Sequence, residues 1–74
     1  MTRLIFHQYI FYKHTVKKYH SKEKAIQRMN AEIENWKNNS PNDLKIDHNV
    51  TPAGVEITSL YVGNSKWADW QIID

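Results

Sequence analysis

The 74-residue sequence contains no cysteine, only two glycines and only two prolines. Without cysteine, neither a disulfide nor a thiolate metal site can hold the fold together. Gly54 and Gly63 both fall between expected strands, so the sequence has no glycine-rich phosphate loop. No apolar run approaches the ~20 residues that a membrane-spanning helix needs. These absences predict a single domain, residues 1–74, with no cofactor and no membrane partner.

One segment, residues 21–38, has the periodicity of an amphipathic helix. Ser21 is a favourable N-cap, because its hydroxyl can accept a hydrogen bond from an unpaired backbone N–H. Asparagines followed by Pro41 predict the end of the helix and a polar loop. An apolar stripe of this kind must be covered, so we expect the rest of the chain to supply a sheet. The stripe consists of Ile26, Met29, Ile33 and Trp36.

Segments rich in β-branched and aromatic residues predict strands on both sides of the helix. The predicted strands span residues 3–12, 44–50, 55–62 and 66–73. Residues 15–19 are ambiguous, because they either pair with the first strand after a turn at Lys13–His14 or prolong that strand. No Asn-Gly or other tight-turn signal is present. A single strand of ~17 residues would nevertheless be far longer than usual, which favours the hairpin.

The expected fold class is α+β, an antiparallel β-sheet of four or five strands with one amphipathic helix packed on one face, ordered ββαβββ or βαβββ. One helix covers only one face, yet apolar residues fall on both. The second face is either partly closed by sheet curvature and long side chains or is a contact surface. Trp36 and Trp70 are assigned to the core. The aromatic residues predicted to bind a partner on the second face are Tyr9, Tyr61 and Trp67.

Positive charge is concentrated in the first part of the chain. Residues 1–29 contain seven Lys or Arg residues and a single acid, whereas residues 30–74 contain three Lys and seven acids. Lysines in the first turn of the helix oppose its macrodipole, which suggests an anion site beside Ser21. The simpler interpretation is a solvated surface. The predicted basic binding patch consists of Lys13, Lys17, Lys18, Lys22, Lys24 and Arg28.

The residues that usually perform catalysis form no recognisable arrangement. The four histidines do not show the spacing of a zinc site. The acidic residues show no acid–base spacing, and no nucleophile elbow is present. We therefore expect no metal site and no enzymatic activity.

The layout, with strands before a Ser-capped helix and a Trp-rich hairpin after it, resembles that of small phage-encoded inhibitors, including some anti-CRISPR proteins. This resemblance of architecture and size implies a cytoplasmic, non-enzymatic binding protein from a phage or mobile element. Such a protein docks on a host protein or protein–nucleic-acid complex and inhibits or modulates it. The alternatives are a small nucleic-acid-binding regulator that uses the basic segment, and a structural homodimer that uses the second sheet face. Eight lysines against two arginines are typical of an AT-rich genome.

Overall fold

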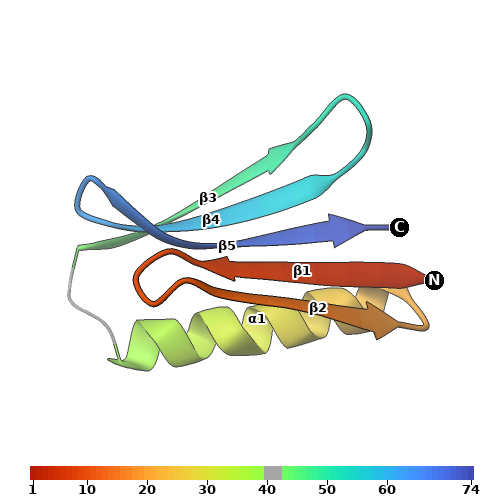
Figure 1. Ribbon diagram of the computed structural model, residues 1–74, viewed down its shortest axis with the longest axis horizontal. Helices are drawn as coiled ribbons and strands as arrows, with labels where there is room; N and C mark the ends of the chain where they lie inside the picture. The colour runs from red at the N-terminus through yellow and green to blue at the C-terminus, as the bar shows by residue number, and fades with distance from the viewer. Residues whose placement is uncertain (40–42) are drawn as a thin grey trace.

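The computed structural model describes residues 1–39 and 43–74 and shows one helix packed on a five-stranded antiparallel sheet (Figure 1). The α+β class is therefore confirmed, and the chain has the ββαβββ order, the hairpin alternative. The helix stop predicted at Pro41 lies outside the described residues. The elements are β1 (Thr2–Gln8), β2 (Lys13–Tyr19), α1 (Lys22–Asn39), β3 (Leu44–Val50), β4 (Glu56–Val62) and β5 (Ser65–Ile73).

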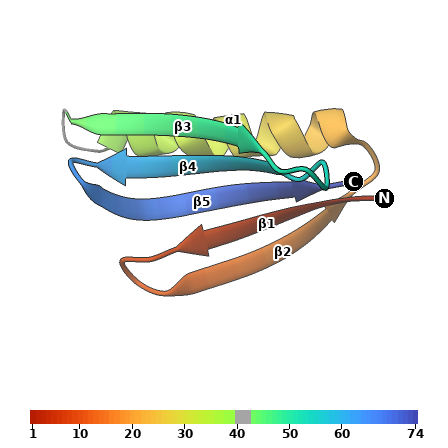
Figure 2. The same cartoon turned by 90° about the horizontal axis from the view of Figure 1, so that it is seen from above.

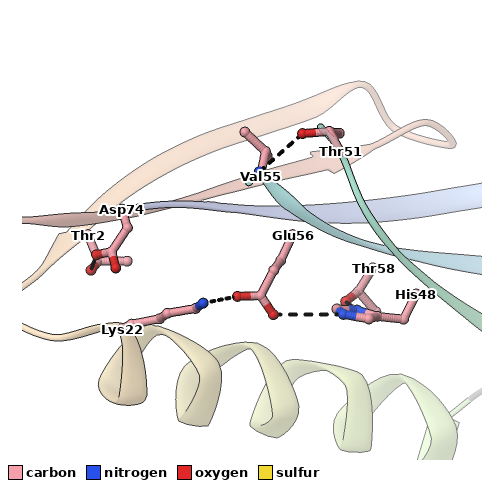
Figure 3. Close-up of polar contacts among 8 residues, drawn as sticks. All are labelled: Thr2, Lys22, His48, Thr51, Val55, Glu56, Thr58 and Asp74. Carbon is pink, nitrogen blue, oxygen red and sulfur yellow. Dashed lines mark hydrogen bonds and ion pairs between the residues drawn. The ribbon is translucent and has the colours of Figure 1, made fainter. Parts of the chain in front are cut away.

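The strands follow the order β2-β1-β5-β4-β3 across the sheet, so the last strand of the chain is central (Figure 2). Strands β2 and β3 form the two edges. Because β1 pairs with β5, the two ends of the chain lie side by side, and the Thr2 hydroxyl donates a hydrogen bond to Asp74 (Figure 3). The first hairpin and the final meander are thereby joined into one sheet by contacts between distant parts of the sequence.

The first hairpin turns earlier than the sequence pattern suggests. Strand β1 ends at Gln8, which pairs with Lys13, so residues 9–12 form the turn. The predicted extension of the first strand to Tyr12 and the predicted turn at Lys13–His14 are therefore wrong. With the earlier turn, the whole of β2 can pair with β1, which a turn at Lys13–His14 would not allow.

The helix α1 and strands β3, β4 and β5 begin and end within one residue of their predicted bounds. Lys24 N donates a 3.3 Å hydrogen bond to Ser21 Oγ, which confirms Ser21 as the N-cap of α1. In the β3–β4 turn, Gly54 N donates a 2.9 Å hydrogen bond to Thr51 O. Gly54 has a φ of 85°, a left-handed conformation that glycine adopts without steric cost.

The hydrophobic core lies between α1 and one face of the sheet. Ala25, Met29 and Ile33 are buried on the helix, as the predicted stripe requires, and Ile26 and Trp36 pack against the same core. The strands contribute the rest of the core, including the fully buried Trp70 of β5, so both tryptophan assignments to the core are confirmed. The core residues on the sheet are Leu4, Phe6, Leu60, Ala68, Trp70 and Ile72.

Within residues 1–39 and 43–74, no helix packs against the other face of the sheet, which we call the uncovered face. The strand register sets Ile5 between Val16 and Gln71, with Ile57 on the far side of Gln71. Ile5 and Ile57 are only half-exposed, whereas Val16 on the edge strand is exposed. Neighbouring side chains thus close part of this face, and polar and apolar residues alternate across it.

Candidate functional site

The turn between β1 and β2, which we call the hairpin tip (residues 9–12), exposes large apolar side chains. The exposed fractions are 38% for Ile10, 78% for Phe11 and 90% for Tyr12. These residues follow one another in the sequence, in the loop that joins β1 to β2 at the end of the hairpin (Figure 1). A contiguous exposed apolar run adds little to folding stability, and on soluble proteins such patches commonly mark interaction sites.

The backbone of the hairpin tip has an unusual conformation at Tyr12. Its φ is 50°, and it is the only non-glycine residue with positive φ in the described part of the chain. For an L-residue with a Cβ, this conformation costs roughly 1–2 kcal/mol, which glycine would avoid. Backbone strain of this kind is often found at functional sites. Neither burial nor backbone preference explains a tyrosine at this position.

The base of the hairpin tip is held in place by Tyr9. Its backbone N–H donates a 2.8 Å hydrogen bond to Trp67 O, and its hydroxyl donates a 2.6 Å hydrogen bond to Asp69 Oδ2. Lys66 Nζ lies 3.1 Å from the same carboxylate oxygen and 5.5 Å from the centre of the Tyr9 ring. The tip is thereby anchored to β5, which reduces the entropy that its outer residues would lose on binding a partner.

Asp69 is the buried centre of this anchor. It is 3% exposed although it lies on the uncovered face, in the same row as His7 and His14. The His7 ring stacks on His14 with 4.3 Å between ring centres, and His7 Nδ1 lies 3.9 Å from Asp69 Oδ1. Within the described chain, Asp69 Oδ1 accepts no hydrogen bond. The lysine and tyrosine on Oδ2 therefore provide most of the compensation for burying this charge.

The anchor predicts a loss of stability at alkaline pH. The pKa of Tyr9 is raised from 10.0 by its hydrogen bond to Asp69 and by burial. For Lys66, burial is the largest single effect and lowers the pKa, but the hydrogen bond and charge attraction of Asp69 help to raise it above 10.5 overall. Both groups hold their protons more tightly in the folded state, so their stabilisation is complete below the unfolded pKa values and disappears as pH rises through the folded ones.

We therefore expect the free energy of unfolding, measured by urea denaturation, to fall above about pH 10. The Tyr9→Phe variant, which has no phenol to ionise, should lose stability less steeply in that range. Lys22, whose pKa is also raised, by its hydrogen bond to Glu56, remains in both proteins, so some slope persists. Identical slopes for the wild type and the variant would show that the Tyr9–Asp69 hydrogen bond does not form in solution.

The three predicted aromatic binding residues do not share one surface. Tyr9 and Tyr61 belong to the uncovered face, but Trp67 does not, and its predicted placement there is wrong. Leu60 pairs with Ala68 and Tyr61 pairs with Lys66, so Trp67 is an extra residue in a β-bulge. The bulge turns Trp67 toward the helix, where its ring meets Trp36 with 6.2 Å between ring centres.

The six residues of the predicted basic patch are also divided among different surroundings. Lys13, Lys17 and Lys18 follow the exposed edge strand β2 and remain available to a partner. Lys18 pairs with Arg3 and lies on the uncovered face, whereas Lys17 pairs with the core residue Leu4 and lies on the helix side. Alternation along the strand therefore separates neighbouring lysines, and β2 is basic on both sides.

The basic residues of the helix are mostly engaged within the fold. Lys22 Nζ forms an ion pair with Glu56, whose Oε1 lies 3.7 Å from His48 Nε2 (Figure 3). His48 Nδ1 in turn lies 3.0 Å from Thr58 Oγ1, so this chain of contacts connects the start of α1 to β4 and β3. Arg28 Nε lies 3.4 Å from a carboxylate oxygen of Glu32, one turn further along the helix. Lys24 is exposed.

Sequence reasoning missed Ile10, Phe11 and Tyr12, which it placed in the first strand. The turn has no glycine, proline or asparagine to mark it. One signal was present, because the run from Tyr9 to Tyr12 is apolar on both strand faces and is followed directly by a basic segment. A strand with one covered face needs apolar residues only at alternate positions. An apolar run at every position is therefore also compatible with an exposed turn.

Residues 1–39 and 43–74 enclose no pocket and contain no group of three or more side chains suited to hold a metal ion. In the same two stretches, α1 is not apolar enough to cross a membrane. Comparison of the chain with protein-family models, with curated proteins and with solved structures finds no match. The exposed surfaces of the hairpin tip and of strand β2 are therefore the candidate binding sites.

Proposed function

We propose that this chain is a small non-enzymatic binding protein that docks on a host protein or protein–nucleic-acid complex and inhibits or modulates it. The proposal rests on one observation, the exposure of Ile10, Phe11 and Tyr12 at the hairpin tip. Aromatic side chains dominate binding energy at protein interfaces, because they bury a large area in the partner's pockets with few rotatable bonds. An anchored hairpin presents them in a fixed arrangement.

The positive charge next to the hairpin tip favours a partner whose apolar pocket is bordered by acidic groups. Residues 1–22 contain no Asp or Glu, and the hairpin tip continues directly into Lys13 and the basic edge strand β2. Lysines around an apolar anchor steer a negatively charged partner during encounter and disfavour basic surfaces. As part of the same proposal we place the protein in the bacterial cytoplasm and its gene in a phage or mobile element, in keeping with its size and lysine-rich composition.

A nucleic-acid-binding regulator is the second candidate, because basic and aromatic side chains share the uncovered face. Tyr9 and Tyr61 lie there with Arg3, Lys18 and Lys66. Single strands bind such surfaces through stacking and phosphate contacts, with an affinity that falls steeply with salt. Asp47 and the buried Asp69 on the same face reduce its attraction for phosphates. We therefore favour the protein partner.

Site-specific photocrosslinking tests the proposal directly. A photoreactive phenylalanine analogue at Phe11 should crosslink the tagged protein to one discrete protein in a lysate of a low-GC bacterium, with or without nuclease treatment. The same analogue at Val50, an exposed position at the opposite end of the sheet, is the matched control and should not capture that protein. Capture of nucleic acid alone, or equal capture from both positions, would contradict docking through the hairpin tip.

A further inference from the structure

We propose that the chain forms a two-fold homodimer in which the edge strand β3 pairs antiparallel with β3 of a second copy. The two edges of the sheet differ in charge. Strand β2 contains Lys13, Lys17 and Lys18 and no acid, so a second copy of β2 would be repelled. Strand β3 contains one residue of each sign, Lys45 and Asp47. Natural edge strands use clustered lysines to prevent pairing, and β3 has no such cluster.

Strand β3 is exposed along nearly its whole length. All of residues 45–50 are exposed, including the apolar side chains of Ile46 (39%) and Val50 (53%). Its register with β4 is regular, without a bulge, and no proline interrupts it. Among the described residues, neither Lys45 nor Asp47 takes part in an ion pair. The outer backbone N–H and C=O groups of such a strand are a template for another strand.

Charge selects one register for this pairing. When Ile46 lies opposite Ile46 of the second copy, Lys45 lies opposite Asp47 of the second copy, and by symmetry Asp47 lies opposite its Lys45. Opposite charges directly across an antiparallel pair are stabilising and like charges are destabilising. Sliding one copy by two residues in either direction places Lys45 opposite Lys45, or Asp47 opposite Asp47. The two-fold axis therefore passes between the two Ile46 residues.

The same register extends the apolar side of the sheet. Ile46 pairs with the fully buried Leu60 on β4, so Ile46 of the second copy would continue a row that begins in the core. The joined sheet would end at both sides in the lysine-rich β2, which stops further growth and closes the assembly as a dimer. Because a single strand from each copy forms the contact, we expect a weak interface with a dissociation constant on the order of micromolar.

Charge reversal combined with sedimentation velocity tests the register. The wild type should pass from monomer to dimer between ~1 and ~500 µM, and Lys45→Asp and Asp47→Lys should each weaken dimerisation by at least about tenfold. An equimolar mixture of the two variants should form a heterodimer, because each acidic side chain of one then faces a lysine of the other. Lys17→Asp, a reversal on the other edge strand, is the matched control and should dimerise like the wild type.

A wild type that stays monomeric across this range would overturn the proposal. A dimer that persists in both single variants, or a mixture that does not associate, would overturn the β3 register. Circular dichroism of each variant shows whether it is folded, and both substituted side chains are exposed. The assay contains no partner and leaves residues 9–12 unchanged, so its outcome is independent of docking through the hairpin tip.

Discussion

The double variant Phe11→Ser/Tyr12→Ser is expected to bind the partner captured through the hairpin tip at least ~100-fold more weakly than the wild type does. Each substitution removes a large aromatic group, and aromatic anchors at the centre of an interface typically contribute about 2 kcal/mol or more. Both side chains are mostly exposed in the free protein, at 78% and 90%. Their removal opens no cavity, so the free energy of unfolding should change by less than about 0.5 kcal/mol.

Isothermal titration calorimetry with the purified partner measures this loss, and urea denaturation of the same preparations measures stability. Val50→Ser is the matched control, because it also removes an exposed apolar side chain from a hairpin, but at the other end of the sheet. It should bind as tightly as the wild type. If the double variant keeps its affinity, the hairpin tip is not the anchor and another surface must bind the partner.

Replacing Trp70 with alanine is expected to lower the free energy of unfolding by about 3–5 kcal/mol. Trp70 is fully buried on the central strand β5, between Phe6 on β1 and Thr58 on β4. Its ring centre lies 5.2 Å from that of Phe6. Small domains usually have a total stability of only about 5–15 kcal/mol, and a chain of this size lies at the low end. Much of the Trp70→Ala protein should therefore be unfolded at 25 °C.

The Trp70→Phe variant is the control for this prediction. It keeps an aromatic ring in the core, and in the described part of the structure Trp70 Nε1 has no hydrogen-bond partner that the substitution would leave unpaired. We expect it to lose about 1–2 kcal/mol, much less than the alanine variant. Urea denaturation followed by far-ultraviolet circular dichroism compares the two. If the free energy of unfolding of the alanine variant lies within about 1 kcal/mol of the wild-type value, Trp70 is not a central residue of the hydrophobic core.

The two proposed surfaces lie on different parts of the sheet and serve different partners. The hairpin tip joins β1 and β2 at one edge, whereas β3 forms the other edge. A dimer paired through β3 would leave both hairpin tips free, since β2 is the strand farthest from the new contact. The tip variant and the charge reversals therefore test independent properties of the chain.

The sequence by itself determined the elements whose cause is local. The spacing of Met29 and Ile33 predicted the buried stripe of α1, and the Ser21 hydroxyl predicted where the helix begins. The residue types of 44–50 predicted β3, and Gly54 was expected in the connection that follows it. Each of these signals acts over a few residues, so no knowledge of distant partners was needed.

Only the tertiary structure decided the features that depend on pairing between distant segments. The turn at residues 9–12 has no glycine, proline or asparagine to mark it and is held by the contacts of Tyr9 with Trp67 and Asp69 on β5. The bulge that turns Trp67 toward Trp36 arises in the register between β4 and β5, and it reverses the simple alternation from which the sequence placed that residue. The ion pair between Lys22 on α1 and Glu56 on β4 likewise joins residues that are far apart in the sequence. A sequence pattern specifies which faces are apolar, but register and long-range contacts specify which side chains remain exposed to a partner.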